Sequence, residues 1–291
     1  MTSWWFSPTP LGRIAAMRTI CYLFTPLDVL VFTPWVADHR DIPTALYEPL
    51  TIARILHLPT PTHAFVVTVG ALLVVVALLA ATGRAPRLLG AAVFCLYGEW
   101  MVIAMSYGKV DHDRYAFLVA LAVLPTVGVA RHGDRTLSQA AGWALRCVQL
   151  AVVLTYFLAA WAKIRFGGLN WPTGAIFDRA ILRRGTVFSQ WLLHYPHLLE
   201  AGQFAMIGFE LASPLILLAR SDRARCAVVA GLVAFHAATF AGITIIFLPH
   251  LIAITALLPL ERFRPAHRLS GYRANLRAGR PMPRQPVPAH D

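Results

Sequence analysis

Long apolar runs separated by short basic loops constrain the fold of this 291-residue chain more than any other feature. About 20 apolar residues in a helix cross the roughly 30 Å hydrocarbon core of a bilayer. Eight runs approach that length, at about residues 11–35, 62–82, 86–107, 114–130, 138–164, 198–218, 225–243 and 245–260. They are continuously apolar, whereas the strands of a membrane barrel alternate. The pattern predicts an all-α, polytopic membrane protein of about eight transmembrane helices, although the last two runs could form one kinked helix.

The charged residues of the chain lie mainly between the apolar runs. Hydrophobic residues make up 57% and charged residues 14% of the chain, and the formal net charge is +12. Such a basic chain could bind nucleic acid, but its arginines lie in short loops and in a tail, which indicates membrane topology. We therefore expect no nucleic-acid partner. The positive-inside rule predicts cytoplasmic N- and C-termini and a multi-pass protein in the cell membrane, with the lipid bilayer as partner. Residues 1–261 would form one transmembrane domain, and the Arg/Pro-rich tail, residues 262–291, would be disordered and cytoplasmic.

Residues 165–197 depart from this charge pattern. The predicted topology places this amphipathic connection and its four arginines on the outer side of the membrane, against the positive-inside rule. The segment could lie in the interface plane or re-enter the membrane partway. Its basic residues could serve a function or could lie on anionic headgroups.

A polar stripe in the fifth apolar run is the strongest local signal for a site. Gln149, Tyr156 and Lys163 are spaced seven residues apart, and Lys163 is one of only two lysines among 26 basic residues. This spacing puts the three side chains along one side of a helix. An apolar helix turns such a stripe away from lipid, toward other helices or a cavity. Lys163 could act there as a base or hydrogen-bond partner, or it could extend its amine to the headgroups.

Other ionisable residues lie inside apolar runs and need partners. Arg18 and Asp28 are ten residues apart, so we expect each to have a partner on another helix. Glu99 and Glu210 could pair with Arg18 or Lys163, or could form part of a proton path. His236 could be a core histidine or a ligand contact. With eight spans, these groups and Lys163 would surround a site that opens toward the outer face.

The loop at residues 108–113 concentrates Lys109, Asp111, His112 and Asp113 before the fourth apolar run. These residue types occur in metal sites, but their spacing matches no particular site. A solvated loop with a helix N-cap at Asp113 is more typical of this pattern. The four cysteines have no CxxC spacing and are expected to be small core residues. We therefore predict no metal site.

The stretch YFLAAWAKIRFGGLNWPTG resembles the motif YF-x-A-G-x-x-K-L followed by W-x-x-G of the horizontally transferred transmembrane (HTTM) family. The family includes the vitamin K-dependent γ-glutamyl carboxylase. The segments LGRIAAMRTICYLFTPLD, FELASPLILL and FHAATFAGITIIFLPHLIAI fit in the same order, and GKVDHDRYAFLVALAVLP resembles the family's N-H-x-Y-L helix start. The resemblance covers about residues 10–260. Ala159-Ala160 replaces the usual Ala-Gly, and Tyr115 follows His112 by three residues instead of two.

The resemblance implies a membrane site in which a reduced quinone of the vitamin K or menaquinol type reacts with oxygen and drives carboxylation. It makes Lys163 and His112 the expected catalytic residues. Expected cofactor-binding residues are Tyr156, Trp161, Glu210, His236, Glu99 and Trp171. The molecule that is carboxylated would be a peptide or protein substrate. The alternatives are a membrane protein that binds a lipid or peptide without catalysis, as in peptide maturation, and, ranked last, a transporter.

Overall fold

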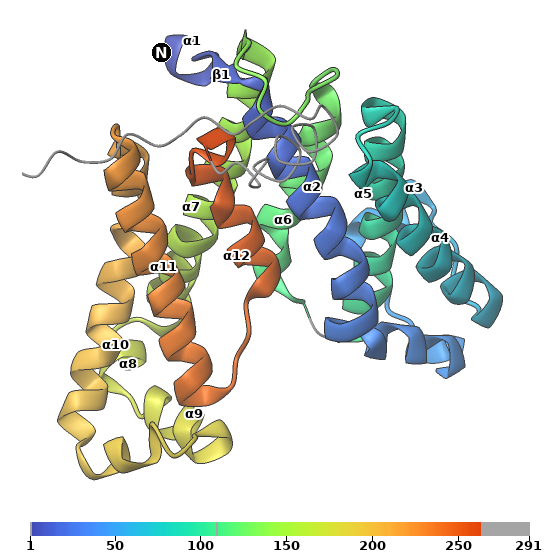
Figure 1. The fold of residues 1–291 in the computed structure, drawn as a ribbon. Coiled ribbons are helices and arrows are strands. Elements are labelled where there is room, and N and C mark those ends of the chain that lie inside the picture. The colour runs from blue at the N-terminus through green and yellow to red at the C-terminus, as the bar shows by residue number, and fades with distance from the viewer. Residues whose placement is uncertain (1, 109, 263–291) are drawn as a thin grey trace, which may run out of the picture.

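The computed structural model describes residues 2–108 and 110–262 and is built almost entirely of helices (Figure 1). The helices of the first half are α1 Thr2–Trp5, α2 Leu11–Leu27, α3 Thr51–Leu56, α4 His63–Ala81, α5 Pro86–Met105 and α6 Tyr115–Val123. Those of the second half are α7 Gln139–Gly167, α8 Asn170–Thr173, α9 Ile176–Arg184, α10 Pro196–Leu211, α11 Asp222–Ile243 and α12 Leu248–Ile254. Two short strands, β1 Thr9–Pro10 and β2 Leu137–Ser138, pair antiparallel with Thr9 opposite Ser138.

Within the described residues, five helices are long and apolar enough to cross a membrane. They are Leu11–Phe32, His63–Ala81, Pro86–Met105, Gln139–Gly167 and Asp222–Ile243. The first of these is α2 extended by a π-helical turn, Asp28–Phe32. The other three expected spans are shorter helices, namely α6, α10 and α12. The membrane character of the chain is thus supported, while the count of eight spans and the side of the termini stay predictions.

Prolines explain why two of those helices are shorter than expected. The run at 114–130 forms α6 only as far as Val123, and a 3-10 turn, Leu124–Thr126, follows at Pro125. The run at 198–218 is divided in the same way, because α10 ends at Leu211 and Pro214 lies in the 3-10 turn Ser213–Leu218. Proline lacks the backbone N–H that would continue the helix and clashes with the preceding turn.

The last two apolar runs are separate helices and not one kinked helix. Helix α11 ends at Ile243, and Thr244 adopts a left-handed conformation with φ of +56°. The chain then runs without regular structure to α12, which starts at Leu248 with Pro249 in its first turn. Proline is well suited to that position because its missing N–H would have no partner within the helix.

The connection between the first two apolar runs, residues 36–61, is not a simple loop. It includes most of the 3-10 turn Pro34–Asp41, the turn Thr44–Leu46 and α3. Of the four cysteines expected in the core, Cys21 is buried and Cys147 half-buried, whereas Cys95 and Cys226 are exposed. The tail expected at 262–291 lies, apart from Arg262, outside the described residues.

Buried polar contacts join α2 to its neighbours, as expected for Arg18 and Asp28. The guanidinium of Arg18 donates to the carbonyl oxygens of Leu124, Val127 and Gly128, just beyond α6. One guanidinium nitrogen of Arg114 lies 2.9 and 2.8 Å from the two carboxylate oxygens of Asp28. Arg18 and Asp28 therefore each have a partner on another part of the bundle, which lowers the cost of burying them.

The helices form two groups joined by α6. Helix α4 packs against α2 and α5, while α7, α10, α11 and α12 make up the second group (Figure 1). Helix α6 contacts α5, α7 and α12 and so lies between the groups. Helix α9 lies at the lower end of the second group in Figure 1, against α10 and α11.

Candidate functional site

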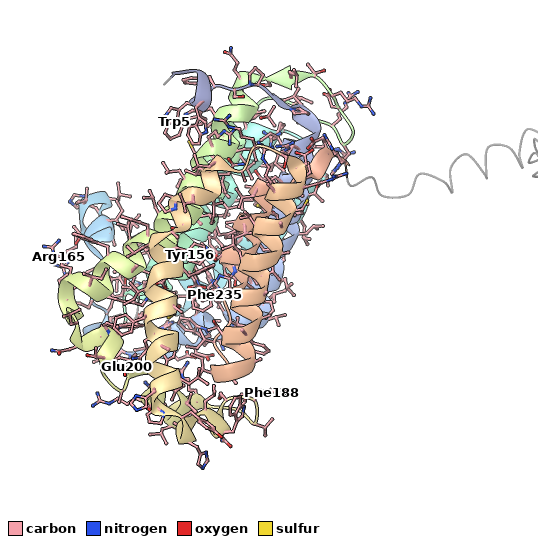
Figure 2. All side chains as sticks on the ribbon, turned by 90° about the vertical axis from the view of Figure 1, so that its left-hand side faces the viewer. Trp5, Tyr156, Arg165, Phe188, Glu200 and Phe235 are labelled. Atoms are coloured by element: carbon pink, nitrogen blue, oxygen red, sulfur yellow. The ribbon has the colours of Figure 1, made fainter. Side chains whose placement is uncertain are left out.

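The polar stripe of α7 faces other helices, as its spacing predicts. At one end, Gln149 donates to the carbonyl oxygen of Ala256 at 2.8 Å and accepts from Arg146 at 2.7 Å. In the middle, the hydroxyl oxygen of Tyr156 lies 2.6 Å from Nε2 of His236 on α11. Figure 2 shows Tyr156 and Phe235 near mid-height of the helices. The stripe therefore fixes α7 against two other parts of the second group.

At the other end of the stripe, Lys163 forms an ion pair with Glu210 on α10. Its Nζ donates to both carboxylate oxygens, at 2.7 and 2.6 Å. The two side chains are only 18% and 5% exposed. Of the partners expected for Lys163, the structure selects Glu210, and the amine is directed into the bundle and not along the outside of α7. An ion pair this well buried would be costly without the two short hydrogen bonds.

A cavity of about 210 Å³ lies beside this pair. Helices α7, α10, α11 and α12 and the turn before α6 contribute its walls. Its ionisable lining residues are His112, Asp113, Tyr156, Lys163, Glu210, His236 and His250. Aromatic and aliphatic side chains, among them Phe235 and Phe247, complete the wall. A space of this size is smaller than the 300–1,000 Å³ typical of drug-sized ligands and suits a single ring headgroup.

His250 is the most deeply buried ionisable residue of the cavity that sequence reasoning did not include in the site. It is 1% exposed, and neither ring nitrogen has a hydrogen-bond partner among the described residues. Its ring lies edge-on to Tyr156, with 4.9 Å between ring centroids, and 5.7 Å from the ring of His236. Burying an unpaired polar group is unfavourable, so His250 is available to a polar ligand. The available signal was the Pro249-His250 pair inside an apolar run.

His112 and Asp113 precede α6 and reach the cavity from the other side. His112 is exposed, and its ring centroid lies 6.4 Å from that of Phe247. Burial raises the pKa of the Asp113 carboxyl, so this group takes up a proton at a higher pH than an exposed aspartate does. The predicted N-cap at Asp113 is wrong, because α6 follows Arg114 and no side chain caps it.

Of the eight expected site residues, Lys163, His112, Tyr156, Glu210 and His236 line this cavity. Trp171 on α8 lies beside it, with its ring centroid 5.3 Å from Nζ of Lys163. Trp161 and Glu99 are not brought to it. Trp161 is 50% exposed on another face of α7, because two residues of helix turn the side chain by about 200° relative to Lys163. Glu99 is on α5, which α6 separates from α7.

Two apolar grooves adjoin the cavity. One of about 580 Å³ runs along α7 beside Tyr115, and it shares His112, Thr155, Ala159 and Lys163 with the cavity. The other, of about 440 Å³, lies between α9, α10 and α11. It shares Met206, Phe235, Thr239 and Ile243 with the cavity. The polar cavity is thus flanked on two sides by space that suits an aliphatic chain.

Comparison of the chain with family models, with curated proteins and with solved structures gives no match. The resemblance to the HTTM family therefore stays a prediction. A functional assignment must be argued from the chain's own side chains.

Proposed function

We propose that this chain is a multi-pass protein of the cell membrane that binds a reduced quinone, or a similar lipid-soluble ring with a hydroxyl group, between α7, α10 and α11. The observation that carries the proposal is the Lys163–Glu210 ion pair on the wall of a cavity that adjoins two apolar grooves. Polar groups at the inner end of an otherwise apolar space suit a molecule with a polar head and an aliphatic chain.

The ion pair gives the site a means of moving a proton. A lysine ammonium has three N–H donors. In Lys163 the ammonium donates to both carboxylate oxygens of Glu210. If one proton passes from Lys163 to Glu210, the neutral amine can accept the proton of a ring hydroxyl. The proton then resides on Glu210, and the ammonium balances the charge left on the ligand oxygen. A reduced quinone supplies the hydroxyl and the reducing electrons when bound.

The other expected residues have supporting roles in this proposal. Phe235 and Phe247 contact the faces or edges of the ring, and Tyr156 with His236 fixes the wall opposite α10. His112 lines both the cavity and the groove along α7, where a second substrate, such as a peptide or protein side chain, would meet the ring. Oxygen-dependent carboxylation follows from the family resemblance alone.

The test uses the full chain reconstituted in nanodiscs, with reduced menaquinone as the probe. Binding is followed by quenching of tryptophan fluorescence, and turnover by oxygen consumption. We expect Lys163→Gln to weaken binding at least tenfold and to abolish turnover. Arg165→Gln is the matched control, because Arg165 is a basic residue two positions later that is exposed. Equal binding and turnover by Lys163→Gln and the unsubstituted protein would refute the role of Lys163.

A non-catalytic lipid- or peptide-binding protein is the second candidate. The groove between α9, α10 and α11 favours it, because this groove is larger than the cavity and lined mainly by apolar side chains. Such a protein would retain the probe without consuming quinol or oxygen. The same oxygen measurement therefore separates the two candidates.

A further inference from the structure

The segment from Arg165 to Tyr195, which contains α8 and α9, exposes an unusual combination of side chains. Its large apolar residues Phe166, Leu169, Leu182, Val187 and Phe188 are 72–81% exposed. Arg165, Arg179, Arg183 and Arg184 are exposed in the same segment, whose one acidic residue is Asp178. Water alone would not favour so many exposed apolar side chains together, and such patches mark interaction surfaces.

Helix α9 carries the centre of this surface. Phe177, Ala180 and Ile181 face α10 and α11, where they line the apolar groove. Arg179, Leu182 and Arg183 lie on the opposite side by helical spacing, and Leu182 is 74% exposed. None of the three arginines of α9 forms an ion pair with a described residue. Their charges are therefore available to an external anion.

Helix α11 places α9 at headgroup level. It has 22 residues, about 33 Å at 1.5 Å per residue, which is close to the roughly 30 Å thickness of the hydrocarbon core. The chain just after α9 lies against the last turn of α11, where the N–H of Thr186 donates to the carbonyl oxygen of Gly242 at 3.2 Å. This part of the chain therefore lies near the membrane interface. Trp191 and Tyr195 near α9 are 53% and 56% exposed, and amphipathic aromatic rings of this kind concentrate at the membrane interface.

We propose that α9 and its flanking residues form an interfacial binding surface for anionic phospholipid headgroups. The arginines of α9 contact the lipid phosphates, and Leu182, Val187 and Phe188 enter the acyl boundary, as in other amphipathic interfacial helices. Guanidinium groups can bind phosphate through two hydrogen bonds at once. The inference does not depend on the proposed quinol function.

A photo-crosslinking probe at Leu182 tests this proposal locally. The full chain with Leu182→benzoylphenylalanine is placed in nanodiscs of phosphatidylcholine and phosphatidylglycerol at nine to one, and crosslinked lipids are identified by mass. We expect phosphatidylglycerol at about fivefold or more above its share, since each basic residue contributes about that factor in affinity. The enrichment should decrease in high salt, and R179Q/R183Q/R184Q should return it to the bilayer share.

Two controls keep the result specific. The same probe at Val75 on α4, which is 54% exposed, should show no enrichment. R131Q/R135Q changes the loop beside β2, at the far end of the helices in Figure 1, and should leave the crosslinks at position 182 unchanged. Two results would overturn the proposal. In the first, the probe at position 182, with the arginines of α9 in place, crosslinks the two phospholipids in their bilayer ratio, which would favour a protein partner. In the second, the enrichment of phosphatidylglycerol survives R179Q/R183Q/R184Q. If the protein fails to bind reduced menaquinone but still enriches phosphatidylglycerol at position 182, only the proposed function is refuted.

Discussion

The two helix groups each contain a buried ion pair, and the pairs differ in what surrounds them. Asp28 is fully buried, and its carboxylate accepts from Arg114 and, at 2.8 Å, from the hydroxyl of Tyr97. Lys163 and Glu210 have only each other as hydrogen-bonding partners among described side chains, and a cavity lies beside them. Both pairs join different helices. The difference indicates that a buried charge alone does not mark a site, and that a buried charge on a cavity wall is the better candidate for contact with a ligand.

The aromatic residues around the two pairs follow the same contrast. Around Asp28, Tyr97 packs edge-on against Phe117 with 5.2 Å between ring centroids, which closes the space. Beside Glu210, the rings of Tyr156, His236 and His250 line the cavity, and the ring nitrogens of His250 have no hydrogen-bond partner in the described part of the chain. The first arrangement suits structural stability, and the second suits ligand binding. Four variants test this division.

Asp28→Ala should have the largest effect on stability. It leaves Arg114 buried without its carboxylate, and breaking a buried pair in this way costs about 3–5 kcal/mol. The free energy of unfolding in detergent, from denaturant titration, measures the loss. Asp41→Ala is the control, because its pairs with Arg40 and His63 are exposed, and exposed ion pairs contribute little to stability. Similar small losses in both variants would contradict a structural role for Asp28.

Replacing the second pair by apolar residues, K163M/E210L, should separate binding from folding. Removing both charges together avoids an unpaired one, so the free energy of unfolding should change by less than about 2 kcal/mol. Binding of reduced menaquinone should nevertheless weaken at least tenfold, because hydrogen bonds to charged groups contribute about 1.5–3 kcal/mol. If the double variant binds the probe normally, the cavity does not use this pair.

His250→Phe should weaken binding less and should not destabilise the protein. Both ring nitrogens of His250 lack partners among residues 2–108 and 110–262, so an apolar ring of similar shape removes unpaired polar groups without breaking a hydrogen bond. We expect an unchanged or higher melting temperature and about a threefold to tenfold weaker binding of the probe. A clear loss of stability would show that His250 has a structural partner and is not reserved for a ligand.

Tyr156→Phe should have a small effect on stability. It removes one hydroxyl and its hydrogen bond to His236, which is worth about 1 kcal/mol. Thermal unfolding monitored by circular dichroism measures this loss. Tyr97→Phe is the matched control beside the Asp28–Arg114 pair. It removes the hydrogen bond that the Tyr97 hydroxyl donates to the buried carboxylate of Asp28, so the loss of stability should be larger. The reverse order would contradict the contrast between the two groups.

The sequence was a good guide to which residues need partners and a poor guide to which partners they have. The seven-residue spacing of Gln149, Tyr156 and Lys163 correctly predicted an inward stripe, since side-chain direction on one helix is a local property. The choice between Glu99 and Glu210 for Lys163 could not be made in this way. That choice depends on which helices pack together, and α6 keeps α5 away from α7.

What the sequence by itself determined is the helical, membrane-suited character of the chain, because an apolar run of sufficient length must satisfy its backbone hydrogen bonds within a helix. It also identified Lys163 as an unusual residue. Only the tertiary structure decided that α11 and α12 are separate helices and that His250 joins the cavity wall. Cavities arise from contacts between residues far apart in sequence, such as Tyr156 with His236 and Lys163 with Glu210, and no local pattern specifies those contacts.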